Sequence, residues 1–132
     1  MKKQRNSKQR QMILDIAMAR HDHPTADQIY LDVRSLDNKI SRGTVYRNLG
    51  ILSENGQITN VKVPSADRYD SRADRHYHIF CTSCGRVFDA PLSYNQEYDE
   101  QITKETGFQI IRHRMIFEGL CPECSTKSNS TN

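Results

Sequence analysis

The chain of 132 residues is long enough for one modest domain or two small ones, which would each gain stability from a metal or a partner subunit. Its mean hydropathy of −0.78 and the lack of any apolar run near the ~18 residues of a membrane helix exclude an integral membrane protein, and the N-terminus lacks the apolar core of a secretory signal, so a cytoplasmic protein is expected. Residues 1–64 carry 11 Lys/Arg against 6 Asp/Glu, whereas residues 65–132 carry 8 against 10, which favours a polyanionic partner for the first half.

Three helices are predicted in the first 56 residues. Apolar side chains recur at helical spacing in residues 7–20, which indicates an amphipathic helix. Thr25 and Gln28 have the spacing of a capping box at the start of a second apolar repeat. Ser41 is a good N-cap for a third helix, and Gly56 stands where a C-terminal glycine is expected.

The periodicity changes after residue 56. Residues 57–64 and 67–70 are rich in β-branched or aromatic side chains and are separated by a turn-like segment, which predicts a β-hairpin. Three helices followed by a hairpin is the order of a winged helix-turn-helix, whose third helix enters the major groove of DNA. We therefore predict a DNA-binding domain over residues 1–71.

The second half is predicted to be a small β-β-α-β module. Its strands are expected at residues 76–81, 85–90 and 108–121, with a helix between the last two that ends at Gly107. Such a small sheet is expected to pair with a second copy, so residues 72–124 are predicted to be an α/β dimerisation domain; a monomer with a partly covered sheet is the alternative. The fold class is thus α+β. Residues 125–132 are polar and expected to be disordered.

All four cysteines fall into two Cys-x-x-Cys pairs. Cys81 and Cys84 are separated from Cys121 and Cys124 by 36 residues. Two such pairs can close a tetrahedral four-sulfur site with no open position, the form of a structural zinc site. Two disulfides or a redox dithiol are the alternatives, and a cytoplasmic location disfavours the disulfides.

A second group of possible ligands lies beside the first cysteine pair. His76 and His78 alternate along a predicted strand, so both side chains are expected on one face, away from the turn that carries Cys81 and Cys84. Two separate sites are therefore expected. A polar strand face without a metal is the alternative for this histidine pair.

The ordered segments RNSKQRQMIL, HPTADQIY, SRGTVYRNL, HYHIFCTSCG and CPEC resemble the ferric uptake regulator family of metal-dependent DNA-binding repressors. The resemblance implies a regulatory site whose ligands are His23, Asp70, His76, His78 and Asp89. Nitrogen and oxygen donors without a thiolate suit Fe2+ or Mn2+, whereas the four-sulfur site suits zinc.

Two features resemble the peroxide-sensing, PerR-like branch of that family. Asp89 stands where iron-uptake members usually carry glutamate, and Arg75-His76-Tyr77-His78 replaces their His-His-Asp-His segment. The second difference also removes ligands of the family's additional metal site. We therefore predict two metals per chain and treat His113 as a strand residue.

The resemblance also implies a mechanism. A regulatory metal would favour the DNA-competent state, and iron would reduce hydrogen peroxide and cause oxidation of a ligand histidine, for which His23 and His76 are the candidates. The oxidised site would bind the ion poorly and the protein would release DNA. Mn2+ in the same ligands would support DNA binding but react little with peroxide.

The predicted third helix carries the candidate DNA contacts. These are Arg42, Thr44, Tyr46, Arg47 and Asn48. Arg47 and Asn48 are candidates for base edges, and Thr44 and Tyr46 for phosphates; an exposed helix face, or packing of Tyr46, is the alternative. A homodimer is expected to read an inverted repeat.

Two other functions remain open from the sequence. The first is a family member that reports iron, manganese or zinc supply without oxidation chemistry. The second is a small non-haem iron enzyme, because histidines and carboxylates also make oxygen-activating sites. Five protein ligands would leave little room for oxidant and substrate, and an enzyme would have no use for the helix-turn-helix, so we predict that the chain is not an enzyme.

Overall fold

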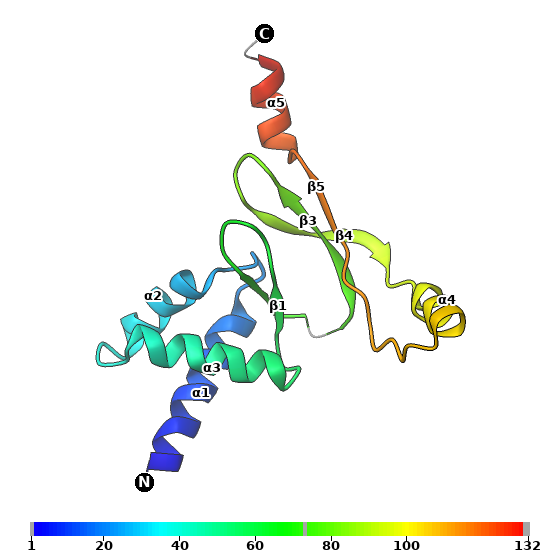
Figure 1. Ribbon diagram of the computed structural model, residues 1–132. Coiled ribbons are helices and arrows are strands. Elements are labelled where there is room, and N and C mark those ends of the chain that lie inside the picture. Colours follow the sequence, from blue (N-terminus) through cyan, green and yellow to red (C-terminus); the bar gives the residue numbers. More distant parts are fainter. Residues whose placement is uncertain (1, 73, 131–132) are drawn as a thin grey trace. The chain divides into compact units, whose positions relative to one another are not determined.

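The computed structural model describes residues 2–72 and 74–130 and divides into an N-terminal unit, Met1–Ala73, and a C-terminal unit, Asp74–Asn132 (Figure 1). The N-terminal unit contains α1 (Lys2–Ala19), α2 (Ala26–Leu36), α3 (Arg42–Glu54), β1 (Thr59–Val61) and β2 (Arg68–Asp70). The C-terminal unit contains β3 (His76–Cys81), β4 (Val87–Ser93), α4 (Gln96–Thr106), β5 (Ile116–Gly119) and α5 (Pro122–Ser130). The predicted α+β class is confirmed. None of the described helices is long and apolar enough to cross a membrane.

α2 and α3 begin at the predicted caps, whereas α1 begins at Lys2, before the predicted start at residue 7. The Thr25 side chain accepts a hydrogen bond from the backbone of Gln28, whose side chain accepts one from the backbone of Thr25 in return. The Ser41 side chain caps α3 by accepting from the Thr44 N–H. Gly56 has a φ of 76°, a conformation that glycine adopts without the steric cost of a side chain.

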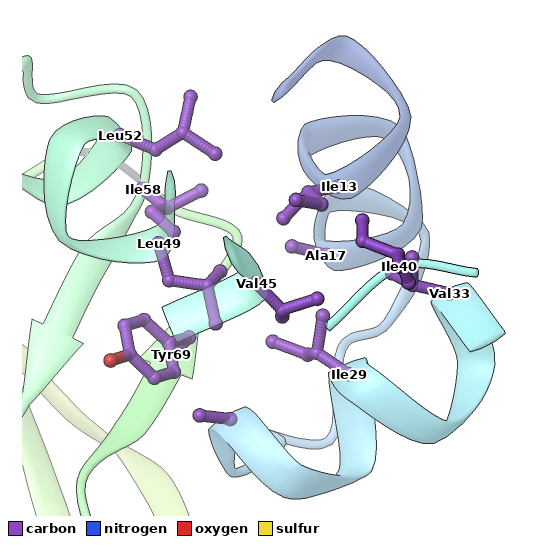
Figure 2. Packing of buried hydrophobic residues seen from close by; sticks show 11 residues of the cluster. Ile13, Ala17, Ile29, Val33, Ile40, Val45, Leu49, Leu52, Ile58 and Tyr69 are labelled. Carbon is purple, nitrogen blue, oxygen red and sulfur yellow. The ribbon is translucent and has the colours of Figure 1, made fainter. Parts of the chain in front are cut away.

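One apolar core holds the three helices and the hairpin of the N-terminal unit together. Figure 2 shows side chains from α1, α2 and α3 converging on a common centre, with Tyr69 of β2 at its edge. The buried members are Ile13, Ala17, Ala26, Ile29, Val33, Ile40, Val45, Leu49, Leu52, Ile58 and Tyr69. Each fully buried aliphatic side chain contributes about 1.5–3 kcal/mol, so this cluster positions α3 as a rigid element.

The C-terminal unit contains a three-stranded sheet in the order β4-β3-β5. β3 pairs antiparallel with β4 and parallel with β5, whose last residue, Gly119, lies opposite Cys81. Because β3 and β5 run in the same direction, the segments that follow them begin at the same edge of the sheet. That edge carries both Cys-x-x-Cys pairs.

The last strand is shorter than predicted. Residues 108–115 are irregular, and only Ile116–Gly119 form β5. Three of their backbone N–H groups bond to side chains: Phe108 donates to Thr106 Oγ1, Ile110 to Thr103 Oγ1, and His113 to the Tyr94 hydroxyl. These residues therefore do not form the predicted strand, and Ile111 is 79% exposed.

The C-terminal segment also differs from its expected disorder. Residues 122–130 form α5, and residues 131–132 of the predicted tail lie outside the described chain. Pro122 occupies the first helical position, where its fixed φ suits a helix and its missing N–H costs nothing. The Ser125 N–H donates to the Cys121 carbonyl at 2.8 Å, so the turn that places Cys121 and Cys124 starts the helix as well.

Candidate metal centres and DNA-binding surface

The four cysteines converge at one edge of the C-terminal sheet. Cys81 ends β3, Cys84 follows in the turn, and Cys121 and Cys124 come after β5, with one sulfur of each within 4.8 Å of the others. All four are free thiols, and the Cys84 and Cys121 sulfurs are 3.9 Å apart. A tetrahedral zinc with Zn–S bonds of about 2.3 Å requires sulfur separations of roughly 3.8 Å. The cluster therefore fits a closed four-sulfur zinc site.

Hydrogen-bond donors beside this cluster favour thiolates at Cys81 and Cys84. The backbone N–H groups of Cys84 and Cys121 donate to Cys81 Sγ, at 3.5 and 3.4 Å, and lower the pKa of Cys81 to about 5. Arg86 donates to Cys84 Sγ at 3.3 Å and to Cys121 Sγ at 3.4 Å, and it pairs with Glu123 at 2.6 Å. The Arg86 hydrogen bond lowers the pKa of the Cys84 thiol as well. A cation beside the sulfurs partly offsets the net negative charge of a four-thiolate zinc site.

In the N-terminal unit, His23 and Asp70 face each other. His23 Nε2 lies 3.1 Å from Asp70 Oδ2, and both residues are buried. The loop that carries His23 is held along β2, because Tyr69 N donates to the Pro24 carbonyl at 2.8 Å and Arg68 Nη1 donates to the His23 carbonyl at 3.1 Å. His23 has a φ of 53°, a conformation that non-glycine residues adopt at a cost of about 1–3 kcal/mol and that is often found at functional sites.

In the C-terminal unit, His76, His78 and Asp89 form a second group. The two imidazole rings are 4.5 Å apart, and their Nε2 atoms lie 3.0 and 3.7 Å from the same Asp89 oxygen. The antiparallel register places His78 directly opposite Asp89, and an irregularity between His76 and His78 lets both rings face it. Both histidine side chains are less than 10% exposed, and Asp89 is 35% exposed.

The hydrogen bonds of His76 show what this group requires. Its Nδ1 lies 2.8 Å from the Asp74 carbonyl oxygen, which can only accept, so Nδ1 carries a proton. In the neutral ring, Nε2 then has a lone pair and faces the Asp89 carboxylate. Two acceptors at 3.0 Å need a cation between or beside them, either a second proton on the ring or a metal ion. The donors fit Fe2+ or Mn2+ by their chemistry.

His113 belongs to a different kind of cluster and is not in a strand, contrary to prediction. Asn95 N donates to the Tyr77 hydroxyl at 2.9 Å, that hydroxyl lies 2.6 Å from His113 Nε2, and His113 Nδ1 lies 2.7 Å from Asp99. Tyr94 donates to the other Asp99 oxygen and lowers the pKa of that carboxyl. Each acceptor in this hydrogen-bond network has a protein donor, so the network needs no metal. His113 thus joins α4 to β3.

The exposed face of α3 carries most of the predicted DNA contacts. Arg42, Tyr46 and Arg47 are exposed, and Arg47 makes no hydrogen bond or ion pair with the described residues. Thr44 is half-buried, and its hydroxyl lies 2.8 Å from the Ser41 hydroxyl at the start of the helix. The arrangement leaves Arg47 free to approach a groove while the first turn of α3 is held by its own cap.

Asn48 differs from this group because it is only 4% exposed. Its side-chain nitrogen donates to the Thr44 carbonyl at 2.8 Å, and its oxygen accepts from Arg10 Nε at 3.0 Å. With both ends of the amide bonded, Asn48 links α1 to α3 and does not reach out as a base-reading residue would. The sequence holds a signal for this role, since Asn48 lies on the same helical stripe as Val45 and Leu52.

Comparisons with known proteins identify the family to which the chain is similar. Residues 2–118 match the model of the ferric uptake regulator family. A peroxide-responsive repressor PerR of Staphylococcus saprophyticus is 35% identical over 120 residues, which cover 90% of this chain and 81% of the relative. A PerR of Staphylococcus epidermidis is 34% identical over 122 residues, with coverage of 92% and 81%.

Solved structures give the same result. A peroxide stress regulator of Campylobacter jejuni aligns with a TM-score of 0.76 and 31% identity, covering 91% of both chains. The ferric uptake regulator of Helicobacter pylori, described with three functional metal-binding sites, aligns with a TM-score of 0.75 and 25% identity, covering 89% of this chain and 80% of that one. Three helices followed by a hairpin in this chain correspond to the winged-helix DNA-binding domain of these regulators.

Proposed function

Because the chain belongs to the ferric uptake regulator family of metal-responsive DNA-binding regulators, we propose that it is a repressor that releases DNA in response to hydrogen peroxide. The proposed regulatory ligands for Fe2+ or Mn2+ are His23, Asp70, His76, His78 and Asp89. The observation that carries the proposal is the geometry around Asp89, one of whose oxygens lies 3.0 Å from His76 Nε2 and 3.7 Å from His78 Nε2, as ligands of one metal ion would. The similarity to PerR proteins supports the peroxide response.

A structural zinc is proposed for Cys81, Cys84, Cys121 and Cys124. The close sulfur positions and the donors around them support thiolates rather than disulfides. Zinc there would hold the end of β3 to the segment after β5 and would have no open position for chemistry. The sulfur ligands would bind zinc, and the nitrogen and oxygen ligands would bind iron or manganese. The zinc site would then stabilise the fold, and the other site would sense the signal.

The proposed signal acts on the ligand histidines. Fe2+ bound there would supply one-electron reduction of hydrogen peroxide, and so an oxidant beside its ligands. His23 and His76 are the proposed targets. An imidazole that has gained an oxygen is a poorer ligand, so His23 and Asp70 of the N-terminal unit would no longer share an ion with the ligands of the C-terminal unit. DNA affinity would fall because the metal had favoured the DNA-competent state.

DNA binding is proposed to use α3 of two copies of the chain. Arg47 is the candidate for a base edge, and Arg42, Thr44 and Tyr46 are candidates for phosphates. Two recognition helices related by a twofold axis would read an inverted repeat. The C-terminal unit is the proposed dimerisation domain.

The direct experiment is mass spectrometry of zinc-loaded protein with Fe2+ or with Mn2+, before and after a low dose of peroxide. The proposal expects one added oxygen on the peptide that contains His23 or His76, with iron only. Asp70→Asn should prevent the oxidation because it weakens the iron site. Asp67→Asn is the matched control, since Asp67 lies in the same segment and pairs with Lys62 at 3.8 Å rather than with a proposed ligand.

The outcomes distinguish the alternatives. Unmodified protein whose DNA binding still responds to metal would identify a regulator of metal supply and would remove the peroxide response. A non-haem iron enzyme would show no salt-dependent binding to duplex DNA in any metal state, and that result would refute the repressor altogether.

A further inference from the structure

The DNA-binding surface contains one carboxylate that no sequence signal assigned to it. Asp27 lies in the first turn of α2, and its Oδ1 accepts hydrogen bonds from two candidate phosphate contacts of α3. The donors are Arg42 Nη1 and the Tyr46 hydroxyl, the latter at 2.6 Å. The Asp27 and Arg42 side chains are 56% and 57% exposed, so the cluster lies at the surface.

We infer that Asp27 competes with DNA phosphate for Arg42 and Tyr46 and so limits the sequence-independent part of DNA binding. The inference rests on the proposed use of α3 as the DNA-contacting helix. Asp27 would affect the strength of DNA binding, and other residues would select the operator sequence.

The Arg42 side chain extends from α3 to contact two residues of α2. Its guanidinium lies 4.7 Å from the centre of the Tyr30 ring, a cation–π contact that adds to the pairing with Asp27. The Tyr46 hydroxyl donates to the same oxygen, and this hydrogen bond raises the pKa of the phenol, which therefore remains a donor. Both α3 donors are thus already bonded to an anion of the protein itself.

A DNA phosphate and the Asp27 carboxylate accept the same hydrogen bonds from Arg42 and Tyr46. Arginine pairs with either through charge-assisted hydrogen bonds, and a tyrosine hydroxyl can donate to either. A phosphate that takes these donors must displace Asp27, and the displaced carboxylate then remains beside a second negative group. Like charges separated by a few ångströms repel most strongly at low salt, where DNA binding is measured most easily.

If Asp27 instead held Arg42 in position for a phosphate, it would strengthen DNA binding. The exposure of the Asp27–Arg42 pair argues for competition and against this second effect. An exposed ion pair contributes little order or stability, so its loss removes little that helps binding. Loss of a negative charge next to a polyanion removes a repulsion at every site on the DNA. The net expectation is stronger binding without Asp27, for any sequence, and therefore a smaller ratio of specific to non-specific affinity.

The experiment measures affinity for a mixed-sequence duplex of about 30 base pairs, roughly three helical turns, by fluorescence anisotropy at several salt concentrations. The protein is the full chain loaded with zinc and Mn2+. Asp27→Asn is expected to bind about 3- to 10-fold more tightly than the wild type, with a salt slope steeper by about one unit as Arg42 becomes available to a phosphate. Asp27→Ala, which removes the acceptor as well, is expected to do the same.

Asp32→Asn is the matched control. Asp32 lies on the same helix, is 46% exposed and also pairs with an arginine, Arg20, at 3.1 Å, but Arg20 is not a candidate DNA contact. Its substitution removes the same charge and should change affinity by less than about twofold. In a background of Arg42→Ala and Tyr46→Phe, the effect of Asp27→Asn should shrink to that of the control, because the donors for which it competes are gone.

Each outcome has one meaning. Equal affinities for Asp27→Asn and the wild type, or weaker binding by Asp27→Asn, would overturn the inference and leave the proposed function intact. An equal gain in Asp32→Asn would show a general charge effect and would also overturn it. Wild-type protein that fails to bind any duplex would overturn the proposed function, and the inference with it.

Discussion

Removal of the proposed zinc should unfold the C-terminal unit and leave the N-terminal unit folded. The perturbation is a strong chelator, or Cys121→Ser, which removes a buried sulfur beside the ends of β3 and β5. Metal binding by a structural zinc site of this type supplies about 10–16 kcal/mol at neutral pH. A complete small domain is stable by only about 5–15 kcal/mol, so this unit is expected to lose its order.

The difference between the two units comes from their cores. The N-terminal unit has eleven buried hydrophobic residues in one cluster. Apart from two cysteines, the buried hydrophobic residues in the described part of the C-terminal unit are only Tyr77, Phe80, Val87 and Ala90. At about 1.5–3 kcal/mol for each large side chain, this core cannot replace the zinc. It also leaves β5, a strand of four residues, as a weakly attached edge.

Hydrogen–deuterium exchange with peptide mass spectrometry tests this, because it reports on each unit separately. After zinc removal, amides of β3, β4 and β5 should exchange within the dead time, while those of α2 and α3 stay protected. Glu118→Gln, at an exposed position of β5, is the control and should retain zinc and protection. Unchanged protection of β3 and β5 in metal-free protein would refute the reasoning, because the sheet would then be stable without the four-sulfur site.

Three further predictions follow from single side chains. Leu49→Ala should destabilise the N-terminal unit by about 2–5 kcal/mol in denaturant unfolding, since Leu49 is fully buried; an effect below 1 kcal/mol would mean that the core is loosely packed. Asp99 has a pKa below its ordinary value of 3.8, chiefly through the Tyr94 hydrogen bond, with His113 and Arg75 also lowering it. Its contribution to stability is therefore present above that value and is lost as the pH falls through the folded-state pKa, and Asp99→Asn should lower the neutral-pH melting temperature while weakening the acid dependence. Arg86→Ala should transfer zinc to a chelator roughly 10-fold faster, measured by absorbance of the chelator, whereas Arg112→Ala should not.

Much of the architecture could be predicted from local patterns. The Thr25 and Ser41 caps, the Gly56 turn and the strand at His76–Cys81 depend on neighbouring residues in the chain, so they are legible in the sequence. The Cys-x-x-Cys pairs likewise carry their spacing with them. The strand predicted at residues 108–115 is absent. A pattern of β-favouring residues forms a strand only where a neighbouring strand is present to share its hydrogen bonds.

Contacts between side chains that are far apart in the sequence were decided only by the tertiary structure. No local pattern places Asp27 beside Arg42 and Tyr46, or Arg86 beside Cys121, because these pairs depend on how two elements pack. The sequence by itself determined which residue types were available for zinc, for iron or manganese and for DNA. Packing decided which charges these residues meet, because electrostatic effects depend on distance in space and not on position along the chain.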